Sequence, residues 1–294
     1  MKKQDTLSKR FILKFKGSLE VKNKEQDKQK KKNKSLYFDL AGYTIPASGA
    51  FAILFLLFTS GLRAQISYST IGSNYTQNFD NLYTTVPANN TTQAASVLPT
   101  GWGFVEAGAN ASTTLRNDNG SSGTGDTYLD GATNSNERSF GSYASGSLTS
   151  QFGASFTNNT GVTLTQFTLS YTGEQWKDGG SGSSVLNTQS FAYSVGATSL
   201  TTGTYTNVTQ LDFTALVNNS SSDITLDGNL PANQRSISFT VTGISWPSGT
   251  TMFIRWTDIN DAGNDDNLAI DGLTFSATTS CAPPSITSIT RNSP

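Results

Sequence analysis

The chain has 294 residues, with 20 Lys and Arg against 21 Asp and Glu, one cysteine and no histidine. The missing histidine excludes Ser-His-Asp and Cys-His nucleophilic catalysis, His-ligated zinc and the commonest general base. The single cysteine, Cys281, excludes a disulfide within the chain. Stability must therefore come from an apolar core or from bound ions.

Charge divides the chain into two chemically different parts. Residues 1–64 carry 14 basic and 5 acidic side chains, whereas the remainder carries 6 basic and 16 acidic ones, a net charge of −10. A basic region at 1–44 precedes the apolar block 49–58 and then Ala64, which is the order of a secretory signal. We therefore expect residues 45–64 to hold the hydrophobic region and the cleavage site of a signal peptide.

The apolar block is shorter than the roughly 20 residues that span a bilayer, so a cleaved signal is favoured over a membrane anchor. We expect a secreted or cell-surface protein with no stable membrane span after cleavage. The negative charge of the mature part opposes the neutralisation of phosphates, so nucleic acid is excluded as an expected partner.

Short alternations of apolar and polar residues from 66 to 278 predict an all-β module. The predicted strands include 167–171, 191–195 and 237–241, each with one apolar face, and the more continuously apolar segments 252–256 and 268–275, which indicate central strands. Turn residues separate these segments, and no amphipathic helix is predicted. The expected fold is an antiparallel, jelly-roll-like β-sandwich.

Two stretches depart from this pattern. Residues 107–136 are rich in Gly, Ser, Thr, Asn and Asp, which predicts a long loop over the sandwich. Residues 279–294 have the composition of a linker that enters a further module of the same polypeptide. We expect such downstream modules to be partners of this one.

An acidic loop between the two predicted central strands is the strongest candidate site. Residues 258–267 crowd carboxylates and amides, which repel one another unless a cation lies between them. The loop is not an EF-hand, because Ala262 and Ala269 stand at two ligand positions. We hypothesise a Ca²⁺ site, with a solvated acidic loop as the alternative. The candidate ligands are Asp258, Asp261, Asp265, Asp266 and the more distant Asp271, joined by Asp80 if the first and last strands pair.

Tryptophans supply candidate contacts for a sugar, because an indole offers a flat apolar face. Trp102 and Trp176 are the candidates, with ordinary core packing as the alternative, whereas Trp256 is expected in the core. Glu174 lies beside Trp176 and is a third candidate ligand contact. With Glu106 or Glu137 it also has the residue types of a glycosidase pair, but no spacing places two of them together. We therefore assign no catalytic residue and expect a non-enzyme.

Several segments together resemble a known kind of module: QNFDNL at 77–82, LPTGW at 98–102, YTGEQW at 171–176, LDF at 211–213, IRWTD at 254–258 and NDDNLAID at 264–271. Over roughly residues 70–277 the chain resembles the N-terminal β-sandwich of large secreted multidomain proteins of Bacteroidetes-type bacteria. The resemblance implies this fold, an extracellular location and fibronectin-like, lamin-tail, nuclease or sorting modules downstream. It implies no established activity.

The last predicted strand is also similar to the final strand of jelly-roll carbohydrate-binding and MAM-type domains, although Gly272 stands where a second Asp is common. Three functional hypotheses follow. The first is a carbohydrate-binding module with a structural Ca²⁺, the second a structural or adhesive spacer, and the third the front domain of a secreted hydrolase or nuclease whose catalytic domain lies downstream. Burial of Trp102 and Trp176 would favour the spacer over the binding module.

Overall fold

The computed structural model describes residues 37–40, 43–46, 64–82, 91–182 and 185–280. The chain divides into two units, Met1–Leu62 and Arg63–Pro294. In the first, β1 (Tyr37–Leu40) and β2 (Tyr43–Pro46) form an antiparallel hairpin. The basic run, the apolar block of the predicted signal and most of the predicted linker lie outside the described residues. Within the described part, no helix is long and apolar enough to cross a membrane.

The second unit is built from strands and two short 3₁₀ turns, η1 (Ala95–Val97) and η2 (Thr209–Leu211). Its strands are β3 (Ile66–Tyr68), β4 (Tyr75–Gln77), β5 (Thr91–Ala94), β6 (Trp102–Ala107), β7 (Thr114–Asp118), β8 (Asp126–Asp130), β9 (Ser139–Tyr143), β10 (Thr149–Asn158), β11 (Leu164–Asp178), β12 (Thr188–Val195), β13 (Thr206–Asn207), β14 (Phe213–Thr214), β15 (Ile224–Thr225), β16 (Gln234–Trp246), β17 (Thr251–Asp258) and β18 (Asn267–Thr278).

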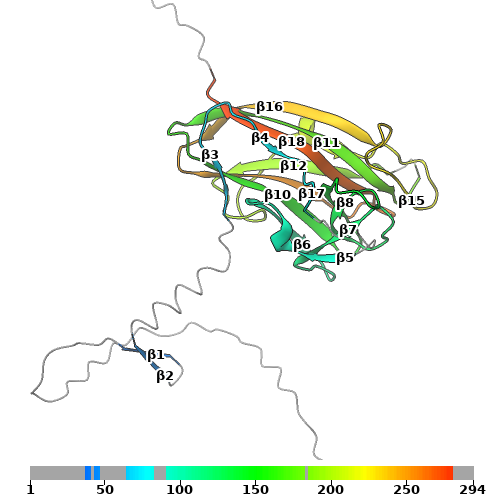
Figure 1. Cartoon of the computed structure of the whole chain (residues 1–294), viewed down its shortest axis with the longest axis horizontal. Helices are drawn as coiled ribbons and strands as arrows, with labels where there is room; N and C mark the ends of the chain where they lie inside the picture. The colour runs from blue at the N-terminus through cyan, green and yellow to red at the C-terminus, as the bar shows by residue number, and fades with distance from the viewer. Residues whose placement is uncertain (1–36, 41–42, 47–63, 83–90, 183–184, 281–294) are drawn as a thin grey trace, which may run out of the picture. The chain divides into compact units, whose positions relative to one another are not determined.

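These strands form two sheets that face each other. A seven-stranded sheet has the order β13-β12-β17-β10-β3, with β14 beside β12 and β6 beside β10. A nine-stranded sheet has the order β15-β11-β18-β9-β8-β7-β5, with β16 beside β11 and β4 beside β18. In Figure 1, β16, β11 and β18 form one layer and β12, β17 and β10 the other. The all-β, jelly-roll-like sandwich predicted from the sequence is confirmed.

Strand pairing is antiparallel except in two places, where β3 runs parallel to β10 and β7 runs parallel to β8. The two strands predicted to be central are central. β17 lies between β12 and β10, and β18 lies between β11 and β9. The five predicted strands fall within β11, β12, β16, β17 and β18.

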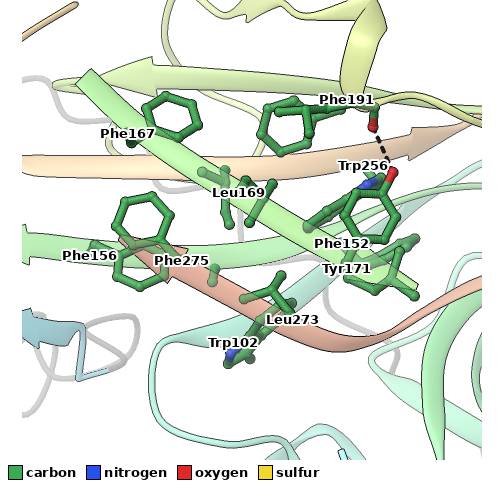
Figure 2. Packing of buried hydrophobic residues seen from close by; sticks show 14 of the residues in the cluster. Trp102, Phe152, Phe156, Phe167, Leu169, Tyr171, Phe191, Trp256, Leu273 and Phe275 are labelled. Atoms are coloured by element: carbon green, nitrogen blue, oxygen red, sulfur yellow. Dashed lines mark hydrogen bonds between the residues drawn. The ribbon is translucent and has the colours of Figure 1, made fainter. Parts of the chain in front are cut away.

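The core fills the space between the sheets with aromatic and aliphatic side chains (Figure 2). Trp256 of β17 is fully buried, as predicted, and its ring centroid lies 5.8 Å from that of Phe152 and 5.3 Å from that of Tyr171. Phe156 and Phe275, from opposite sheets, stack with centroids 4.4 Å apart. Each such side chain stabilises the fold by about 1.5–3 kcal/mol through burial alone.

The prediction of a long loop at residues 107–136 is wrong, because β7 and β8 lie within it. All five residues of β8 are buried, including Asp126 and Asp130. Both faces of β8 are therefore covered by protein, and most of its polar side chains form hydrogen bonds there, although Asp130 Oδ2 has no partner among the described residues. Tyr128, for example, donates a hydrogen bond to Ser122 Oγ at 2.9 Å. A buried polar strand has the composition of a loop, which explains the error.

Candidate functional site

Carboxylates gather on the outer face of the nine-stranded sheet, where β11 and β18 run side by side. Thr172 of β11 pairs with Asp271 of β18, and Glu174 pairs with Ala269. Because side chains alternate along a strand, Glu174 lies on the face opposite to that of the buried Tyr171. Two acidic residues from neighbouring strands therefore reach the same outer surface.

A β-bulge sets the direction of Asp271. Ile270 and Leu273 are both fully buried although they are three residues apart, a spacing that strict alternation does not allow. The pairing with β11 shifts register at this point, and Gly272 has φ of 57°, in the left-handed region that favours glycine. The bulge keeps both halves of β18 in the core and leaves Asp271 outside it.

Glu137, two residues before β9, completes a group of three carboxylates. One oxygen from each of Glu137, Glu174 and Asp271 lies within 4.8 Å of the others. Asn229 Nδ2 donates a hydrogen bond to Glu137 at 2.6 Å, and Trp176 Nε1 donates one to Glu174 at 3.1 Å. Oε1 of Glu137 and Oδ1 of Asp271 are buried and have no hydrogen-bond partner among the described residues. We call these three residues the carboxylate cluster.

The electrostatics of the carboxylate cluster oppose its full ionisation. Burial, and then the charges of Glu137 and Asp271, raise the pKa of Glu174 to about 8. Burial, and then the charges of Glu137 and Asp80, raise the pKa of Asp271 to about 7. Burial also raises the pKa of Glu137. Without a cation the cluster must hold protons near neutral pH, and a cation between the carboxylates would replace them.

Asp80 borders the carboxylate cluster, as expected if the first and last strands pair. β4 pairs with β18, with Gln77 opposite Leu273. Asp80 accepts hydrogen bonds from the backbone N–H of Arg138 at 3.1 Å and from Asn78 Nδ2 at 2.6 Å. Its charge contributes to the raised pKa of Asp271, although it is outside the group of three within 4.8 Å.

The other four predicted metal ligands lie outside the carboxylate cluster that contains Asp271 and borders Asp80, and calcium at either place stays a prediction. Among the described residues, the grouping of three acidic ligand atoms within 4.8 Å is found at Glu137, Glu174 and Asp271. Asp258 is buried and accepts a hydrogen bond from Ser142 Oγ at 2.8 Å. In the loop itself, Asp265 accepts the N–H of Asp261 and Asp266 accepts that of Gly179, each at 2.7 Å. The carboxylates of Asp265 and Asp266 therefore fix the backbone of the loops through hydrogen bonds.

The two tryptophans predicted to contact a sugar are core residues, which corrects that prediction. Trp102 is 0% exposed and Trp176 1% exposed. Trp102 packs between Phe79 and Trp256, with centroids 4.7 Å and 6.5 Å away. A Cβ on Gly228 would lie 2.5 Å from the Trp176 ring, so this loop sits directly against the indole. Neither ring offers a face to a ligand.

Glu174 is 2% exposed, so it cannot contact a polysaccharide directly, and this ligand assignment is also corrected. The structure does bring Glu174 and Glu137 together, which no spacing in the sequence indicated. A glycosidase acid or nucleophile must reach the anomeric carbon of its substrate. Burial of Glu174 beneath the surface denies that access, so the pair suits a cation better than a sugar.

Two hollows flank the carboxylate cluster. One, of about 300 Å³, is lined by residues that include Trp176, Thr133 and Asp227. The other, of about 370 Å³, is lined by Asn78, Gly272 and residues of β4 and β18. Their volumes lie at the lower end of the range for ligand pockets.

No protein-family model and no curated protein sequence matches the chain. Solved structures that match it include the xylan-binding CBM22-1 domain of Paenibacillus barcinonensis Xyn10C, at 8% identity and a TM-score of 0.31, over 73% of this chain and 100% of that domain. The N-terminal cellulose-binding domain of Cellulomonas fimi β-1,4-glucanase C matches at 14% identity and a TM-score of 0.28, over 60% of this chain and 90% of that domain.

The enzymatically active domain of bacteriophage CBA120 tailspike protein 4 matches at 9% identity and a TM-score of 0.33. That match covers 60% of this chain but only 19% of the tailspike chain. These likenesses are too distant to assign a site or an activity.

Proposed function

We propose that residues 66–278 form an extracellular, non-catalytic module that binds polysaccharide and is stabilised by Ca²⁺ at the carboxylate cluster. The observation that carries the proposal is the convergence of Glu137, Glu174 and Asp271 within 4.8 Å, with unpartnered oxygens on two of them. Ca²⁺ prefers carboxylate oxygens and takes 6–8 oxygen ligands, so Asp80, backbone carbonyls or water would complete its shell.

Two arguments support a non-catalytic role. The chain has no histidine, and burial of Glu174 shields the Glu137–Glu174 pair from a substrate. Polysaccharide is proposed as the ligand because the module resembles carbohydrate-binding jelly rolls in its last strand and because its predicted export signal directs it to an extracellular location. Ligand contacts must then come from residues other than Trp102 and Trp176.

The second candidate function is a structural or adhesive spacer that carries other modules. The burial of Trp102 and Trp176 favours it, because those rings were the expected contacts for a ligand. A calcium ion at the carboxylate cluster is compatible with either role, since it acts on the stability of the fold. Binding to polysaccharide is the property that separates the two.

Calcium is expected to raise the melting temperature of the chelator-treated protein. At a free Ca²⁺ concentration about 100-fold above Kd the stabilisation is about 2.7 kcal/mol. For a domain of this size that is a rise of roughly 5–10 °C. The measurement is a thermal melt at pH 7.5 with EGTA and with increasing CaCl₂, run beside a polysaccharide-binding screen under the same two conditions.

Asp271→Asn is the matched variant, because it removes one charge of the carboxylate cluster and keeps the shape of the side chain. It is expected to lose most of the calcium-dependent rise, while Asp261→Asn, in the 258–266 loop, keeps it. The reverse pattern would place the ion in that loop. If calcium does not raise the melting temperature of the unmodified protein, calcium is removed from the proposal. If the protein binds none of the polysaccharides, the spacer function is the candidate that remains.

A further inference from the structure

The outer face of the seven-stranded sheet holds a guanidinium in a fixed position. Ile254 and Trp256 of β17 are buried in the core, so Arg255 between them lies on the outer face. Its guanidinium carbon lies 3.6 Å from the centroid of the Tyr205 ring. Its Nη1 donates hydrogen bonds to the carbonyl oxygen of Leu200 and, at 3.4 Å, to Gln151 Oε1. The side chain is therefore held in place before any ligand arrives.

This cation lacks a counter-ion within the described part of the chain. The salt bridges there join Arg116 to Asp126 and Lys177 to Asp223, and no described carboxylate lies within 4.0 Å of the Arg255 guanidinium nitrogens. Its Nε is buried and has no hydrogen-bond partner among those residues. A partly buried charge without a partner is costly, and an anion that pairs with it recovers that cost.

Small residues neighbour Arg255 across the sheet, and the position that is open is Gly103. Along the row of paired residues that crosses the sheet, Ala192 and Gly153 flank Arg255, and Gly103 follows Gly153. A Cβ on Gly103 would meet no atom within 4 Å. Phe253, two residues along β17 on the same face, is half-buried and lies in a row with Ser194 and Ser155. An aromatic ring, a fixed guanidinium and the open position at Gly103 therefore share this surface.

We propose that this surface binds an acidic polysaccharide, with the carboxylate of a uronic acid unit on Arg255 and a pyranose ring against Phe253. The inference deepens the proposed function and rests on it. A guanidinium donates charge-assisted hydrogen bonds to a carboxylate, and an aromatic ring covers the apolar face of a sugar. An acidic peptide offers the carboxylate but not that ring, so the sugar is favoured.

The rest of the module carries mostly negative charge, which affects how this binding behaves. Long-range attraction cannot bring a polyanion to the protein, so the contact at Arg255 itself must supply the affinity. Repulsion between distant charges is screened within about 10 Å at 0.1 M salt, whereas a partly buried pair is screened less. Binding is therefore expected to persist at 0.15 M NaCl.

The test compares binding of the purified protein to polygalacturonate and alginate, which contain uronic acids, and to dextran, which is neutral. Arg255→Gln is expected to weaken binding to both uronates by at least about 10-fold, the loss that corresponds to 1.4 kcal/mol. Arg235→Gln is the matched control, because its guanidinium also lies over an aromatic ring, 5.9 Å from the Phe213 centroid, but on a different strand. It is expected to bind like the unmodified protein. Melting temperatures confirm that both variants fold.

Phe253→Ala provides a second readout and is expected to weaken binding to the uronates as well. Unchanged binding by Arg255→Gln, or equal loss in Arg235→Gln, overturns the assignment of this surface. If the protein binds dextran as tightly as the uronates, the proposal that the ligand is acidic is overturned, but the proposed function of polysaccharide binding stands. If poly-glutamate binds as strongly as polygalacturonate, the proposal that the ligand is a sugar is overturned. If no polysaccharide binds, both proposals are overturned.

Discussion

Trp102→Ala is expected to lower the free energy of unfolding by about 3–5 kcal/mol, the usual cost of truncating a buried tryptophan. Trp102 is fully buried, stacks with Trp256 and meets the edge of Phe79. Its Nε1 donates a hydrogen bond to Tyr75 Oη at 2.8 Å. Removing the ring leaves a cavity between the two sheets and removes the hydrogen bond that the Tyr75 phenol accepts. Urea denaturation followed by fluorescence and circular dichroism measures the change.

Trp102→Phe keeps the variant measurable if the alanine form does not fold. It retains an aromatic ring and loses the hydrogen bond, so its expected cost is smaller, on the order of 1–3 kcal/mol. Val105→Ala, at a side chain that is 39% exposed in the same strand, is the surface control and should change stability by less than about 1 kcal/mol. A Trp102→Ala protein as stable as this control would show that the ring is not a core residue.

The calcium-free protein is expected to lose stability as the pH rises from about 4 to 8. In the folded state the pKa of Glu174 is raised to about 8 and that of Asp271 to about 7, from ordinary values of 4.5 and 3.8. Between those limits the folded state binds more protons than the unfolded state, so the free energy of unfolding falls with increasing pH. The expected loss is on the order of 3 kcal/mol, allowing for coupling between the two groups.

Glu174→Gln tests the origin of that loss. The amide cannot ionise and still offers an oxygen to Trp176 Nε1, so in EGTA the variant should be more stable than the unmodified protein at pH 8 and vary less with pH. Saturating calcium should remove the loss in the unmodified protein and have little effect on the variant. Asp223→Asn is the control, because Lys177 lowers the pKa of Asp223 and its removal cannot flatten this profile. A flat profile for the unmodified protein in EGTA would contradict the prediction.

The five predicted strands are present because alternation, which predicted three of them, and a continuous apolar run, which predicted two, are both local properties. A period of two puts every second side chain on one face, whatever strand pairs beside it. The chain therefore showed which side chains of β17 enter the core, and Trp256 is among them. It did not show β7 and β8, because polar residues on a covered outer face interrupt the apolar pattern.

The sequence also showed that calcium-type ligands are abundant, but it did not show that Asp271 lies with Glu137 and Glu174. Nearness along the chain suggested the loop at 258–266, where the carboxylates bind backbone N–H groups of the same and neighbouring loops. The carboxylate cluster instead combines Glu137, Glu174 and Asp271 from three separate segments. Glu174 and Asp271 lie in the motifs at 171–176 and 264–271, whereas Glu137 offered only the residue type of a possible partner for Glu174.

By itself, the sequence determined the all-β class, several strands and the core position of Trp256, because each follows from composition and a local period. Tertiary structure decided which carboxylates meet and that Trp102 and Trp176 are buried. Those outcomes depend on strand register, on the bulge at Gly272 and on the loop that covers Trp176 at Gly228. Such features arise from contacts between segments that are distant in the sequence, and a local sequence pattern does not determine those contacts.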